Sequence, residues 1–145
     1  YKLLVQARDK SGNLSGKNDF EIEFEVINKS AITQVINYPN PFTTKTHFVF
    51  TLTGSRIPDV FTIRIYTISG QIVKEIHKDE LGNIHIGNNI TDYFWDGTDM
   101  YGDRLANGVY FYQVTVEFRD AEMNNIETNA DKYFKSGMGK MYLFR

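Results

Sequence analysis

The sequence predicts an all-β protein: an Ig-like antiparallel β-sandwich preceded by a β-hairpin. Apolar and polar residues alternate with a period of two along most of the chain, and helical three-four spacing is nowhere sustained. From Gln34 onward, strand-like segments and turn signals recur at the spacing typical of a sandwich. Of the 145 residues, 41% are hydrophobic and 14% aromatic, which is enough apolar material for a packed core.

The N-terminal segment predicts the hairpin. In residues 20–26 the apolar side chains share one face and three glutamates the other, and residues 3–8 supply a partner strand. Residues 9–13, Asp-Lys-Ser-Gly-Asn, provide the turn. An isolated hairpin is only marginally stable, so we expect this one to pack on something else.

Three segments follow from this organisation. We expect residues 1–28 to be the last strands of a preceding Ig-like domain, residues 29–33 to be a polar linker, and residues 34–145 to form the C-terminal domain. The chain opens at Tyr1 without a charged-then-apolar signal segment, which predicts a fragment of a longer precursor.

Residues 34–145 hold the strands expected for the sandwich. Pro39 and Pro41 lack an N–H donor, so their segment should lie at a sheet edge or corner, and Phe42 should fold back into the core. Chain ends fray unless a sheet holds them, so the apolar run near the C-terminus must be docked or held ready for a partner. The expected strands are residues 46–53, 61–66, 71–76, a brief 84–86, 109–118 and the terminal 141–144.

Composition excludes several function classes. The net charge of −2 comes from 16 basic and 18 acidic residues that are interspersed, whereas nucleic-acid binding needs clustered Lys and Arg. The chain has no cysteine, so disulfides, thiol nucleophiles and thiolate metal sites are excluded. No apolar stretch approaches the roughly 20 residues of a transmembrane helix.

We expect no catalytic, cofactor or metal site in this chain. His47, His77 and His85 lack metal-ligand spacing, and no serine lies in a nucleophile-elbow pattern. The carboxylates of Asp96, Asp99 and Asp103 could gather a calcium ion, but their spacing does not match an EF-hand loop. Turn capping by these side chains is the preferred interpretation.

An aromatic cluster suggests an alternative function. Tyr93, Phe94, Trp95 and Tyr101 could form a platform for sugar rings, which would make the chain an adhesive or carbohydrate-binding module. The competing interpretation places Trp95 in the core of the sandwich.

Three motifs, in a fixed order, carry a family resemblance. They are residues 37–42 (Asn-Tyr-Pro-Asn-Pro-Phe), residues 65–73 around Ser69-Gly70, and residues 95–112, from Trp-Asp-Gly-Thr-Asp to Asn-Gly-Val-Tyr-Phe-Tyr. With the ending 139–145, this set resembles the C-terminal target domains of type IX secretion substrates in Bacteroidetes. The motif positions are Pro39, Asn40, Pro41, Phe42, Gly70, Trp95, Asp96, Gly97, Gly102, Gly108 and Tyr110.

The resemblance implies a sorting signal without catalytic activity. Such domains direct a precursor through the outer-membrane type IX translocon, and a sortase-like peptidase releases or anchors the cargo at the cell surface. Exposed strand edges pair readily with other chains, so we expect the last strand to be read by strand addition. The recognition residues implied are Gly139, Lys140, Met141, Tyr142, Leu143, Phe144 and Arg145.

Two long connections depart from the compact pattern of that family. Residues 77–92 and 119–137 are mostly polar, and connections of such length are uncommon in small domains. They resemble the target domain of the translocon's own sortase-like peptidase component. The last two motifs also resemble the Ig-like domain of flagellar hook-capping proteins, which leaves an assembly domain as a third hypothesis.

Overall fold

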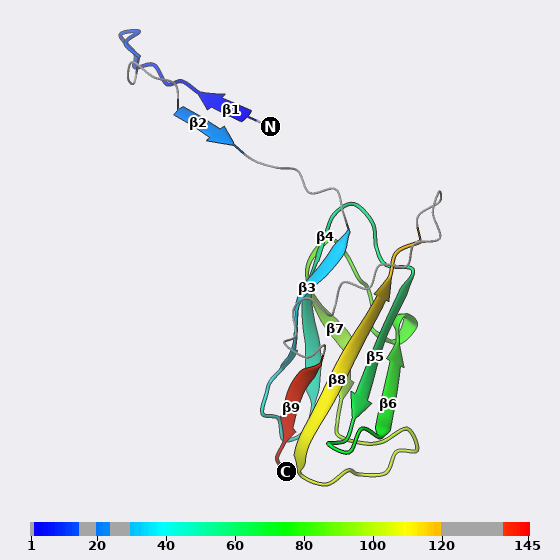
Figure 1. The fold of residues 1–145 in the computed structure, drawn as a ribbon. Helices are drawn as coiled ribbons and strands as arrows, with labels where there is room; N and C mark the ends of the chain where they lie inside the picture. Colours follow the sequence, from blue (N-terminus) through cyan, green and yellow to red (C-terminus); the bar gives the residue numbers. More distant parts are fainter. Residues whose placement is uncertain (1, 15–19, 24–29, 120–137) are drawn as a thin grey trace.

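The computed structural model describes residues 2–14, 20–23, 30–119 and 138–145. Within these ranges nine strands alternate with loops and one short 3-10 helix, and none of the described residues forms a helix suited to crossing a bilayer. Figure 1 shows the strands in order. They are β1 (Lys2–Val5), β2 (Phe20–Glu23), β3 (Ala31–Tyr38), β4 (Thr46–Thr53), β5 (Val60–Tyr66), β6 (Ile72–His77), β7 (Gly87–Trp95), β8 (Gly108–Glu117) and β9 (Gly139–Leu143), with the helix η1 (Lys78–Glu80) after β6.

Seven of these strands form the predicted sandwich. One sheet has the order β3-β4-β7 and the other β6-β5-β8-β9, and every pairing within them is antiparallel. The all-β fold class is therefore confirmed. Strands β3 and β9 are edge strands, each with one partner in its own sheet.

The core lies between the two sheets because a central strand of each sheet buries alternate residues. In β4 and β8 the inward-facing side chains are buried and their neighbours half-buried. Aromatic rings meet across the interface: Phe48 lies 5.3 Å from Tyr112, and Phe50 lies 4.9 Å from Phe61, between ring centroids. These edge-to-face contacts join the sheets into one core.

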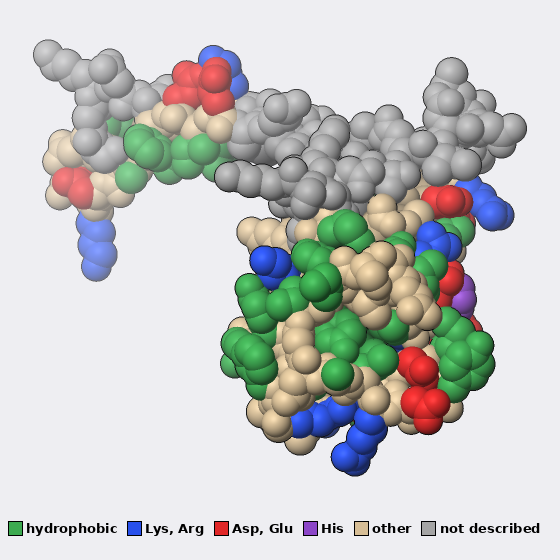
Figure 2. Space-filling model, turned by 60° about the horizontal axis from the view of Figure 1, so that its bottom comes forward, with side chains coloured by type: hydrophobic (Ala, Val, Ile, Leu, Met, Phe, Trp, Pro, Cys, Tyr) green, Lys and Arg blue, Asp and Glu red, His purple; other side chains and the backbone are tan. Residues whose placement is uncertain are grey.

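The N-terminal hairpin forms as predicted, with β1 paired to β2 in antiparallel register. Its turn is fixed by the Asp9 carboxylate, which accepts hydrogen bonds from the backbone N–H of Ser11 and Asn13. All described residues of the two strands are exposed, with Phe20 66% and Leu4 61% accessible (Figure 2). The hairpin thus presents apolar side chains without a core of its own.

Two predicted boundaries differ from the structure. Strand β3 begins at Ala31, so three residues of the segment assigned as linker 29–33 pair with β4. The brief strand expected at 84–86 is wrong; β7 begins at Gly87 instead. The buried polar side chains Asn89 and Thr91 disguise this strand in the sequence, because they stand where apolar residues would be expected.

Asn89 and Thr91 are buried because their polar groups find partners. The Asn89 side chain donates to the carbonyls of His85 and Gly87 and accepts from the His85 N–H. The Thr91 hydroxyl donates to the Tyr93 carbonyl and accepts from the Phe48 N–H. The predicted polar connection 77–92 is therefore partly strand; most of the other, 119–137, lies outside the described residues, as do residues 24–26 of the predicted hairpin.

Two phenylalanines test this description of the core. Phe50→Ala should lower the free energy of unfolding by about 3–5 kcal/mol, because the ring is 1% exposed and its loss leaves a cavity. Phe20→Ala, in the exposed hairpin, should change it by less than about 0.5 kcal/mol. Urea unfolding followed by Trp95 fluorescence measures both, and equal losses would contradict the assigned core.

Candidate functional site: the terminal strand and its supports

The terminal strand β9 is the segment that the resemblance implies as the recognition element. It pairs with β8, with Tyr110 opposite Met141 and Gly108 opposite Leu143. Met141 and Leu143 are fully buried in the core, whereas Lys140 is exposed and Tyr142 half-buried. Strand β9 is thus an integral part of the sandwich, so of the two predicted alternatives, docked or held ready for a partner, the structure shows the docked one.

The outer edge of β9 is occupied by the corner between β3 and β4. The Asn40 side chain donates from Nδ2 to the Lys140 carbonyl at 2.9 Å and accepts from the Tyr142 N–H at 3.0 Å. One residue pair further along, the Phe42 N–H donates to the Tyr142 carbonyl and the Phe42 carbonyl accepts from the Phe144 N–H. The expectation of an open edge, ready for strand addition, is wrong for this state.

The corner that covers this edge is tied to both of its strands. The Pro39 carbonyl accepts hydrogen bonds from the side chains of Asn37 in β3 and Thr46 in β4, and Pro39 and Pro41 both follow cis peptide bonds. Phe42 is 2% exposed. Its ring centroid lies 5.6 Å from that of Trp95, so the predicted return of Phe42 into the core is confirmed.

The turn after β7 contacts the C-terminal end of β9. Trp95 is buried and donates from Nε1 to the Thr98 carbonyl, while the Asp96 carboxylate accepts from the backbone and hydroxyl of Thr98. Asp99 in turn accepts from the N–H groups of Tyr101 and Asp103. Turn capping by Asp96 and Asp99 is therefore confirmed.

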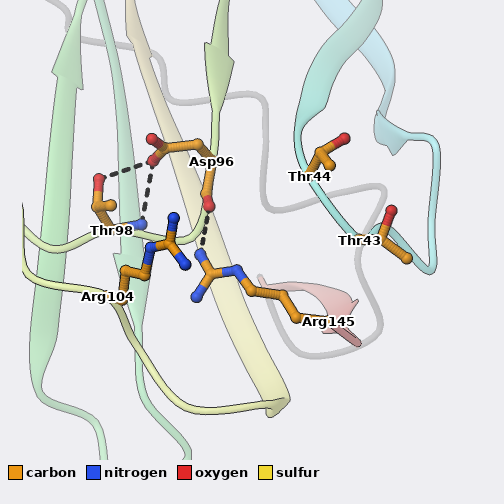
Figure 3. A pocket seen from close by; sticks show the side chains of 6 residues that line it. All are labelled: Thr43, Thr44, Asp96, Thr98, Arg104 and Arg145. Carbon is orange, nitrogen blue, oxygen red and sulfur yellow. Dashed lines mark hydrogen bonds between the residues drawn. The ribbon is translucent and has the colours of Figure 1, made fainter.

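Arg145 is fixed by backbone carbonyls of this turn. Its guanidinium donates to the carbonyls of Asp96, Gly97 and Leu105, and Figure 3 shows the bond to Asp96. The Asn107 side chain accepts from the Arg145 N–H at 2.9 Å and donates to the Arg145 carbonyl at 3.1 Å. In the sequence Asn107 belongs to the Asn-Gly pair of the third motif, and nothing in the local pattern indicates a contact 38 positions away.

An open hollow of about 460 Å³ lies beside these contacts. Figure 3 shows Arg104 and Arg145 on one side of this hollow and Thr43 and Thr44, from the corner, on the other. Partial burial would raise the pKa of Asp96, but hydrogen bonds from Thr98 and the charge of Arg145 outweigh it and hold that pKa below its ordinary value. The lining residues are Thr43, Thr44, Asp96, Thr98, Arg104 and Arg145.

The other motif positions have structural places. Gly108 opens β8, and Tyr110 packs against Trp95 at 5.4 Å while its hydroxyl donates to the Ala106 carbonyl. Gly102 lies in the Asp99 turn, and Gly70 lies in the turn between β5 and β6, where its N–H donates to the Thr67 carbonyl.

The residues considered for other chemistry are dispersed. Within the described ranges, no three His, Asp or Glu side chains are grouped to hold a metal ion. The predicted sugar-binding platform is wrong, because its four aromatic residues do not form one exposed surface. Trp95 is buried and Tyr93 partly buried, while Phe94 is 45% and Tyr101 84% exposed. The core interpretation of Trp95 is confirmed.

Alanine substitutions at two glycines distinguish the cost of a strained backbone from the cost of a clash with the terminal segment. Both Gly97 and Gly102 have positive φ, +75° and +88°, so alanine costs about 1–2 kcal/mol at either position. A Cβ at Gly97 would also lie 2.7 Å from atoms of Leu143 and Arg145, whereas at Gly102 the space is open. In urea unfolding, Gly97→Ala should therefore be clearly more destabilising than Gly102→Ala, and equal losses would contradict the close contact.

Comparison with known proteins shows that the fold of this chain occurs in another protein. No family model matches the chain, and no curated protein does. The crystal structure of dimeric latent PorU from Porphyromonas gingivalis is similar to it, with a TM-score of 0.51 and 20% sequence identity over 98% of this chain. The chain spans 12% of the length of that protein, so the likeness shows that its fold recurs in one part of PorU.

Proposed function

We propose that this chain is a non-catalytic C-terminal sorting domain, which directs upstream cargo through the type IX outer-membrane translocon for release or anchoring at the cell surface. One observation carries the proposal. Two of the three motifs that resemble type IX target domains supply the groups that hold the terminal segment: Asn40 and Phe42 from the first, and Asp96, Gly97 and Asn107 from the last.

The physical logic is that a signal read in folded form needs a fixed shape. Terminal residues fray unless they are tied down, and here the ties come from far earlier in the chain, 100 positions away between Asn40 and Lys140 and 38 positions away between Asn107 and Arg145. Hydrogen bonds from the two motifs thus hold the terminal segment in place, as a second partner strand holds a strand inside a sheet. A sorting role explains why so many contacts converge on the last seven residues.

The partners under this proposal are the type IX translocon and its sortase-like peptidase, acting on an exported protein. The likeness to part of PorU supports the sandwich fold on which the proposal depends. Any enzymatic activity of the precursor would reside in the upstream cargo and not in these residues.

A gain-of-function experiment tests the proposal. A periplasmic reporter fused upstream of the full chain should appear outside cells of a type IX host, whereas the reporter alone should stay inside. Removing residues 139–145 should abolish export. Because this deletion also removes the buried Met141 and Leu143, the matched control is Phe61→Ala, which loses a buried ring but keeps the tail and should still be exported. Retention of the intact, folded fusion in the periplasm would contradict the proposal.

An exposed row of aromatic side chains supports carbohydrate binding as the second candidate function. On the outer face of the β3-β4-β7 sheet, Tyr38 pairs with His47 and His47 with Phe94, and Tyr38 is 65% exposed. Such a row could stack on sugar rings. If this is the function, the full chain binds a glycan array, and Tyr38→Ala and Phe94→Ala each abolish binding while Tyr101→Ala does not. Absence of binding by the wild-type chain would exclude it.

A further inference from the structure

The hollow beside the terminal segment has a polar lining with a positive charge. Its volume is about 460 Å³, and the described residues that line it are three threonines, two arginines and one aspartate. Sites that take small organic ligands have volumes of roughly 300–1,000 Å³. Two guanidinium groups and one carboxylate give these side chains a net charge of +1, which favours an anionic ligand.

Neither arginine of the lining is neutralised by a carboxylate. The Arg145 guanidinium donates to three backbone carbonyls, which carry no charge, and it has more N–H groups than these contacts use. Arg104 is exposed, and among the described residues no hydrogen bond or ion pair engages its side chain. Both arginines therefore keep N–H donors for a ligand.

The carboxylate of the lining is occupied by a neighbour in its own turn. Oδ1 of Asp96 accepts from the N–H of Thr98 at 3.1 Å and from its hydroxyl at 2.7 Å. Thr43 and Thr44 differ from Thr98, because they are exposed and no described group binds their hydroxyls. Figure 3 shows them across the hollow from the arginines, so free donors lie on two opposite sides.

We propose that this hollow binds a phosphate group, carried as an ester by a larger molecule. Guanidinium groups donate to phosphate oxygens with matching geometry, and hydroxyls can donate to the oxygens that remain. A tetrahedral group presents oxygens to both sides of the hollow, whereas a planar carboxylate presents two oxygens in one plane. The hollow exceeds the size of one phosphate, which leaves space for the esterified part. The proposed donors are Arg104, Arg145, Thr43 and Thr44.

A bound phosphate would join three segments that surround the end of β9. These are the corner after Phe42, the turn after β7 and Arg145 itself. The backbone carbonyls already hold Arg145 in place, so its side chain loses less freedom when the ligand binds. Because the ligand binds the folded chain, it should also raise the melting temperature. This inference goes beyond the sorting function and does not depend on it.

Titration of the full chain with glucose 1-phosphate at constant ionic strength tests the site. The backbone amide signals of Thr43 and Thr44 should shift in NMR spectra and saturate. Arg104→Gln should weaken binding at least tenfold and melt like the wild-type chain without ligand, because its side chain makes no contact in the described structure. Arg8→Gln is the matched control, since it removes the same charge from the exposed N-terminal hairpin and should bind normally. Equal weakening by both variants, or no saturation, would overturn the site.

Two further measurements test the chemistry of the ligand. Thr43→Val and Thr44→Val keep the side-chain volume but lose the hydroxyl, and at least one of them should weaken binding threefold or more. Inorganic phosphate should compete with glucose 1-phosphate, whereas acetate should bind at least tenfold more weakly. Normal binding by both valine variants would overturn the role of the hydroxyls, and equal binding of acetate would overturn the choice of phosphate.

Vesicles distinguish the two sources of such a group. The full chain is sedimented with phosphatidylcholine vesicles, with and without phosphatidic acid. Binding of glucose 1-phosphate without binding to either vesicle would identify a soluble phosphate ester. Binding to the phosphatidic acid vesicles that Arg104→Gln loses and Arg8→Gln keeps would identify a lipid headgroup. Binding to neither the sugar phosphate nor the vesicles would overturn the proposal.

Discussion

The hydrogen bonding of one edge strand is the constraint on which the rest of this structure depends. Strand β9 contributes Met141 and Leu143 to the core, so the sandwich is complete only when this short terminal segment stays paired. Five residues in a ladder with β8 are a weak hold for a chain end. The proline corner and the turn after β7 supply further hydrogen bonds to the terminal segment. Holding this segment is the structural role of both motifs.

Packing and hydrogen bonding are joined in the same residues. Phe42 offers its backbone to β9 while its ring packs on Trp95, and Trp95 packs on Tyr110 of β8. Trp95 also braces the turn whose carbonyls bind Arg145. A change in the core at this end therefore reaches the surface of the terminal strand directly, through groups in contact.

Much of the fold could be predicted from the sequence, because period-two patterns in strands such as β4 and β8 report burial directly. Strand β7 is not predicted, since Asn89 and Thr91 are buried by hydrogen bonds that no local pattern reveals, and the brief strand expected at 84–86 does not form. The corner at Pro39 and Pro41 was predictable from the missing N–H groups, but the role of Asn40 was not. Contacts between residues about 100 positions apart leave no periodic trace in one sequence.

The long sequence separation between the corner and β9 has a consequence for biosynthesis. Residues 39–42 leave the ribosome well before residues 139–145, so the contacts that close the sandwich are the last to form. A nascent or prematurely ended chain lacks Met141 and Leu143 and exposes the unpaired edge of β8. Closure of the sandwich therefore waits for residues 139–145, and until they have been made the edge of β8 stays accessible to chaperones and proteases.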